Sequence, residues 1–203
     1  ILYVTNNYAL FSHPDYPNIA PAFSAGFVKT IGHWNEIFPK VGFTLLFIPG
    51  LILISNFFKK NYYLLSLILI IFTVGKFLIN GEVDGLVSIY FVSVALIIVS
   101  IRYTNKSLLN FLTLISFCIT LTLLKLESLP LIVCLMFSTF FLFYKEKSTS
   151  FKILISIFIS LIPIISWHIF TNYNGIDNAN SKYYAYSLNS LIKNISVFKN
   201  HIM

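Results

Sequence analysis

The chain has 203 residues, of which 57% are hydrophobic and only 10% are charged, and its formal net charge is +7. A soluble domain of this length does not need so much apolar sequence, and the mean hydropathy of +0.83 agrees with that judgement. The basic excess argues for a nucleic-acid partner only in a soluble protein. Here many lysines fall in short stretches between apolar runs, which is typical of membrane topology. The composition therefore predicts a bilayer protein with no nucleic-acid partner.

Residues 1 to 40 precede the first long apolar run and contain the sequence His-Pro-Asp-Tyr-Pro at 13–17. Proline fixes its own φ and biases the preceding residue toward extended backbone, so Asp15 and Tyr16 are expected in a stiff loop. Such a loop suits a binding site. His13 is a phosphate ligand or, more simply, a loop residue bonded to backbone. Asp15 either takes part in the function of the protein or only caps the turn before Pro17.

The first residue is not Met, and no signal-like segment follows it, so the sequence predicts an internal fragment or a trimmed chain. This expectation bears on where further site residues would be sought.

Six apolar runs follow, each of about 16 to 18 residues, which as helices reach roughly 24 to 27 Å, the short end of what crosses a hydrocarbon core. The runs cover 41–58, 62–79, 86–101, 108–124, 129–144 and 153–170. The short stretches between them leave no sequence for an amphipathic, water-facing exterior. We therefore expect an all-α, polytopic transmembrane bundle of about six spans over residues 41–170. Residues 171–203 would form an external tail or begin the next segment.

The charges between the runs predict the orientation of the bundle. When alternate stretches are placed on opposite sides, one face receives seven basic residues and one acidic residue, and the other receives seven basic and six acidic. The first face should be cytoplasmic by the positive-inside rule. Residues 1–40, the stretch 81–85, the corner at 125–127 and the tail from 171 then share the extracytoplasmic face of a cell (inner) membrane.

Four of the ionisable residues on that predicted external face lie close to the apolar runs. Glu82 and Asp84 lie between two glycines, where backbone can approach a ligand closely, and Lys125 and Glu127 lie at a corner between two apolar runs. Two carboxylates and a lysine could deprotonate a hydroxyl and neutralise a phosphate leaving group. The simpler reading is that the carboxylates only end helices and that Lys125 snorkels to the interface.

The order of four segments resembles the membrane glycosyltransferases of the GT-C fold, in particular the bacterial group related to protein mannosyltransferases and lipid A aminoarabinose transferases. The segments are SHPDYPNIAPAFSA, NGEVDGLVSIYF, LKLESLPLIV and PIISWHIF. The resemblance covers most of residues 11–170. It implies a polyprenyl-phosphate sugar donor and transfer to a lipid, glycan or protein hydroxyl on the extracytoplasmic face. The family's general base follows its first span, which this chain lacks, so the principal base is expected upstream of Ile1.

The resemblance implies a role for each candidate. Asp15 would orient the acceptor or assist the base, and Glu82 and Asp84 would line the site or hold a divalent metal; these three form the catalytic set. Lys125 would stabilise the phosphate. The substrate-binding set is His13, Tyr16, Lys125 and Glu127. The sequence names no cofactor.

Two other classes remain open. A transporter or flippase should carry ionisable groups in the middle of its spans, and Lys76, the one candidate, lies near the end of a run. A membrane scaffold without enzymatic activity would need none of the carboxylates.

Overall fold

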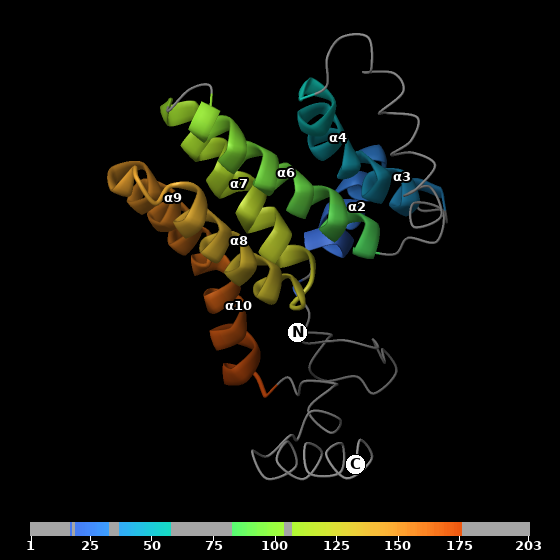
Figure 1. Ribbon diagram of the computed structural model, residues 1–203. Coiled ribbons are helices and arrows are strands. Elements are labelled where there is room, and N and C mark those ends of the chain that lie inside the picture. Colours follow the sequence, from blue (N-terminus) through green and yellow to red (C-terminus); the bar gives the residue numbers. More distant parts are fainter. Residues whose placement is uncertain (1–16, 18, 33–36, 58–82, 104–106, 176–203) are drawn as a thin grey trace, which may run out of the picture. The chain divides into compact units, whose positions relative to one another are not determined.

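The computed structural model describes residues 17, 19–32, 37–57, 83–103 and 107–175, and every regular element in these ranges is an α-helix (Figure 1). The all-α class expected from the sequence is confirmed for this part of the chain. The helices are α2 (Ile19–Ile31), α3 (Ile37–Leu45), α4 (Phe47–Asn56), α6 (Val83–Tyr103), α7 (Leu108–Leu124), α8 (Ser128–Leu142), α9 (Lys147–Ser160) and α10 (Ile162–Tyr173).

The chain divides into two compact units. One is Tyr16–Trp167, and the other combines Ile1–Asp15 with His168–Met203. Of the second unit the structure describes residues 168–175, which include the end of α10. The residues of the hydrophobic core belong to the first of these units.

Two helical stretches are long and apolar enough to cross a membrane: Val83–Tyr103, and Lys147–Tyr173, which combines α9 and α10. The other apolar helices among the described residues have 10 to 17 residues. The predicted run 62–79 lies outside the described residues. Two candidate membrane helices are therefore present in the described part, and the count of six spans stays a prediction.

The region assigned to a loop from the sequence, residues 1–40, contains helix α2 and the start of α3. Pro21 is the third residue of α2, where a missing backbone N–H leaves no helical bond unmade. The helix ends at Gly32, whose φ of 77° is left-handed and whose N–H donates to the Val28 carbonyl at 3.0 Å. The prolines and the short apolar run of this stretch do not resemble a span, so the sequence predicts a loop there.

Prolines explain why two predicted runs are each divided into two helices. Pro49 has no N–H for the carbonyl of residue 45, where α3 ends, and α4 begins only after a turn at Leu46. Pro163 likewise has no N–H for the carbonyl of residue 159, and Leu161 separates α9 from α10. Pro130, in contrast, lies in the first turn of α8 and interrupts nothing.

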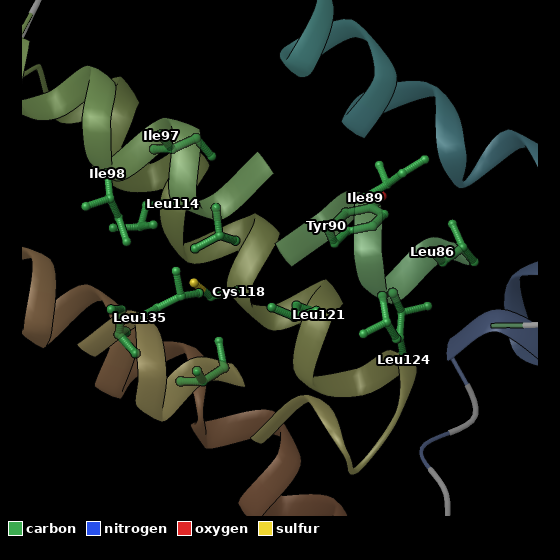
Figure 2. Packing of buried hydrophobic residues seen from close by; sticks show 14 of the residues in the cluster. Leu86, Ile89, Tyr90, Ile97, Ile98, Leu114, Cys118, Leu121, Leu124 and Leu135 are labelled. Carbon is green, nitrogen blue, oxygen red and sulfur yellow. The ribbon is translucent and has the colours of Figure 1, made fainter. Parts of the chain in front are cut away.

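The core is built around α6 and α7, which pack along each other (Figure 1). Side chains at helical spacing on both helices and on α8 meet there, as Figure 2 shows for Leu86, Ile89, Tyr90, Ile97, Ile98, Leu114, Cys118, Leu121, Leu124 and Leu135. All of them are buried. The spacing of three and four residues places them on one face of each helix.

Helix α4 approaches α6 closely because it presents Gly50 to Ile89. A Cβ added at Gly50 would lie 2.3 Å from Cγ2 of Ile89. Two hydroxyls of α6 then reach backbone carbonyls of α4 and of the turn before it: Ser93 Oγ donates to Gly50 O at 3.4 Å, and Tyr90 Oη donates to Leu46 O at 2.9 Å. Leu46 lies at the turn between α3 and α4, so the Tyr90 hydroxyl finds a backbone acceptor there and ties α6 to this turn. Small residues and hydroxyls at a helix contact are typical of membrane bundles.

The outward faces of the helices carry many large apolar side chains, while several hydroxyl groups lie inside. The exposed side chains include Phe137, Phe140, Phe141, Phe151, Phe158, Ile162 and Ile165. The buried hydroxyls include Ser93, Thr122, Thr139, Ser156 and Ser160, each bonded to a backbone carbonyl. A water-soluble bundle is expected to show the opposite arrangement.

Candidate functional site

The α6–α7 hairpin brings one end of each helix to the same level. The helices are joined by the stretch between Tyr103 and Leu108, and they have 21 and 17 residues. Asp84, the second residue of α6, therefore lies beside Lys125, which directly follows α7. The residues are 41 positions apart in sequence.

An ion pair joins these two residues. Lys125 Nζ donates to Asp84 Oδ1 at 2.8 Å, and the side chains are 26% and 57% exposed respectively. Each charge also suits its helix end, because Asp84 lies in the first turn of α6 and Lys125 at the C-terminal cap of α7. Hence the pair stabilises the end of the hairpin and presents a partly accessible carboxylate and ammonium there.

Ser128 holds the backbone of the corner that carries Lys125. Its buried Oγ donates to the Lys125 carbonyl at 2.6 Å, and its N–H donates to the same oxygen at 3.1 Å. Lys125 itself is extended, with φ −159° and ψ 142°. Ser128 was not among the site residues predicted from the sequence. A serine that begins a helix three residues after a candidate lysine is the signal that could have found it.

The pair also acts on the protonation of the lysine. The hydrogen bond that the Lys125 ammonium donates to Asp84 raises the pKa of Lys125 above its ordinary value; partial burial opposes this, and the negative charges of Glu127 and Asp84 add to it. Lys125 is therefore a cation throughout the physiological range. It can stabilise an anion, but it cannot act as a general base there.

The pH dependence of stability follows from the upward direction of this pKa shift. Because the pKa of Lys125 is higher in the folded protein, its charge stabilises the folded state fully at pH values below the ordinary pKa of 10.5. This contribution is lost as the pH rises through the pKa of the folded state. Because the pair is partly exposed, we expect it to contribute only about 0.5 kcal/mol to the free energy of unfolding. The melting-temperature difference between the wild type and Lys125→Met should be constant between about pH 7 and 9 and shrink above 10.5. A difference that disappears below pH 9 would contradict the pairing.

The structure thus brings together three of the candidates chosen from the sequence: Asp84 and Lys125 in direct contact, and Glu127 close enough to affect the charge of Lys125. The other four, His13, Asp15, Tyr16 and Glu82, lie outside the described residues. Within the described ranges, no group of three or more His, Cys, Asp or Glu side chains could hold a metal ion.

Two cavities border α9 and contain none of these residues. One of about 360 Å³ lies between the end of α8 and α9 and includes Lys147 and Ser150. The other, of about 420 Å³, lies between α7 and α9 and includes Lys152 and Ser156. The first cavity lies at the beginning of α9 and the second at the beginning of α7, whereas the Asp84–Lys125 pair lies at the end of α7.

Comparison with known proteins adds no assignment. No protein-family model, no curated protein and no solved structure matches this chain.

Proposed function

We propose that the chain is a multi-pass part of a membrane protein, with the six predicted apolar segments as its spans. The observation that supports this is the apolar exterior around buried, internally bonded hydroxyls. Hydrocarbon tolerates exposed phenylalanine, and it requires polar groups to find partners inside the bundle. The charged side chains described for α6 to α8 lie at or just beyond the helix ends, as in a chain that places them at the two interfaces.

A membrane glycosyltransferase is the activity we propose for this bundle, with a polyprenyl-phosphate sugar as donor. The Asp84–Lys125 pair is the observation that carries the proposal, because it joins a proton acceptor to a cation at the predicted external face. A carboxylate accepts the proton of the acceptor hydroxyl, whose oxygen forms the new bond to the anomeric carbon of the sugar. The bond from that carbon to the phosphate oxygen breaks, and polyprenyl phosphate leaves as an anion.

The ion pair suggests how Lys125 would take part. In the free protein its ammonium bonds Asp84 and orients that carboxylate. A donor phosphate would compete for the same ammonium, and Asp84 would then be free to accept a proton. Lys125, a cation because its pKa is raised, would balance the charge that develops on the phosphate.

Sugar transfer in native membranes tests the activity. Membranes from source cells and from cells with the gene deleted would receive radiolabelled polyprenyl-phosphate mannose or aminoarabinose. Loss of label transfer from at least one donor in the deletion strain, and its return with the full-length gene, is the expected result. Equal transfer from both donors by both membranes would refute the proposal for these sugars.

The predicted topology is tested by labelling single cysteines in intact cells, in a background where the exposed Cys134 is replaced by Ala. A membrane-impermeant maleimide should modify Leu126→Cys at the external corner and leave Ser148→Cys at the start of α9 unlabelled until the cells are opened. Ser148 is exposed and Leu126 partly exposed, whereas the neighbouring Ser128 is buried and unsuitable. The reverse labelling pattern would overturn the orientation.

A further inference from the structure

The cavity between α8 and α9 combines apolar walls with one polar end. Its walls come from aromatic side chains at the end of α8 and just beyond it, Phe140, Phe143 and Tyr144, and from Phe151 and Leu154 of α9. Its polar groups are Lys147 and Ser150 in the first turn of α9. At about 360 Å³ it is at the lower end of ligand-sized cavities. It would hold a small head group together with the beginning of an apolar chain.

Ser150 indicates that something polar belongs in this cavity. The residue is only 8% exposed, and among the described residues its hydroxyl has no hydrogen-bond partner. Its neighbour Thr149 is buried to a similar extent, but Thr149 Oγ1 donates to Glu146 Oε2 at 3.2 Å. Leaving a buried hydroxyl unpaired costs free energy. An acceptor supplied by a ligand in the cavity would remove that cost.

The surrounding charges favour an anion. Lys147 is exposed and forms no ion pair with any described residue. Arg102, at the end of α6, lies with its guanidinium carbon 5.6 Å from the ring centre of Phe143, a wall of the cavity. Lys145 lies in the turn between α8 and α9. Glu146, the acidic residue described in this turn, accepts a hydrogen bond from Thr149. A phosphate group in the cavity would meet the Lys147 ammonium and the free Ser150 hydroxyl, whereas Lys145 does not line the cavity.

We propose that this cavity binds an anionic glycerophospholipid, with its phosphate at Lys147 and Ser150 and an acyl chain along Phe140, Phe151 and Leu154. An isolated phosphate would leave these apolar walls without a partner, whereas the acyl chain covers them. The exposed apolar face of α8, which includes Phe137 and Phe141, adjoins the cavity on the same helix. The inference rests on the membrane placement proposed above, and it does not depend on the transferase activity.

Native mass spectrometry of the delipidated, detergent-purified protein tests the proposal. Phosphatidylglycerol should bind more tightly than phosphatidylcholine with the same acyl chains, and soluble glycerol 3-phosphate should not displace it. Lys147→Gln should weaken phosphatidylglycerol binding about fivefold or more, the effect of one lysine near an anionic surface. Lys145→Gln is the matched control, since it removes the same charge from an adjacent exposed position outside the cavity wall, and it should change binding less than twofold.

Ser150→Ala separates a ligand contact from a structural role. Removing a hydroxyl that bonds the lipid should weaken binding about two- to tenfold, the range expected for one hydrogen bond, and it should not lower the melting temperature of the lipid-free protein. Leu154→Trp, which fills the cavity, should abolish binding while Lys147 is retained.

Three results would overturn the lipid site: equal binding of the two lipids, equal losses for Lys147→Gln and Lys145→Gln, or full displacement by glycerol 3-phosphate. A protein that remains in the supernatant when membranes are sedimented would instead refute the membrane placement. Membrane fractionation therefore distinguishes failure of this inference from failure of the proposed function.

Discussion

Asp84→Asn is expected to lower sugar transfer by roughly tenfold or more, the scale of a lost acid–base contact, while the protein remains folded in the membrane. Lys125→Met should have a comparably large effect, because it removes the cation that orients Asp84 and meets the leaving phosphate. Lys125→Arg should be intermediate: the charge remains, but a planar guanidinium does not reproduce a single ammonium contact. Transfer from the polyprenyl-phosphate donor, at matched protein levels in native membranes, is the measurement.

The size of the stability effect separates a functional pair from a structural one. An exposed ion pair contributes only about 0.2 to 1 kcal/mol, too little to change activity tenfold by unfolding the protein. If the two residues act as a unit, the double variant should lose little more activity than the worse single variant. Lys145→Met is the control at the predicted cytoplasmic end and should transfer normally. Near-normal turnover by well-expressed Lys125→Met would show that this lysine is only an interfacial anchor.

Gly50→Leu is expected to prevent α4 from docking on α6. Even the Cβ of alanine would lie 2.3 Å from the branch methyl of Ile89. Gly50→Ala alone should therefore lower the free energy of unfolding by about 1 to 3 kcal/mol, and leucine should lower it further. Displacement of α4 would also break the bond from Tyr90 Oη to the Leu46 carbonyl, which lies at the helix break. Thermal unfolding in detergent would measure the loss.

Two further variants make this test specific. Gly26→Ala is the matched control: a Cβ at Gly26 meets nothing within 4 Å, and in the middle of α2 alanine should be neutral or stabilising by about 0.5 to 1 kcal/mol. Adding Ile89→Ala to Gly50→Ala removes the colliding methyl, so the two losses should not add. Additive losses would show that Gly50 matters for a reason other than its approach to Ile89.

Helix positions in the core could be predicted from the sequence to within a few residues. The apolar runs predicted at 86–101, 108–124 and 129–144 correspond to helices Val83–Tyr103, Leu108–Leu124 and Ser128–Leu142. Length, apolar composition and the placement of charges are local properties, and backbone hydrogen bonding within an apolar segment leaves few alternatives to a helix. Helix α2 was not predicted because its 13 residues are too few to resemble a span.

The candidate site could be predicted only in part. Asp84 and Lys125 were placed on one face by alternation of charge between successive runs, which requires no knowledge of packing. Their contact at 2.8 Å depends on how far each helix is rotated about its axis. A helix that is apolar on nearly all sides has no stripe that specifies this rotation. The role of Ser128 depends on the conformation of the corner, so it could not be predicted from the sequence either.

By itself, then, the sequence determined the all-helical class, the extent of the central helices and the gathering of charges at their ends, because all three depend on local composition. The tertiary structure alone decided that Gly50 meets Ile89, that Asp84 pairs with Lys125 and that the Ser150 hydroxyl is buried beside a cavity. Each of these depends on contact between different helices, and close packing permits such contacts only where the side-chain shapes fit.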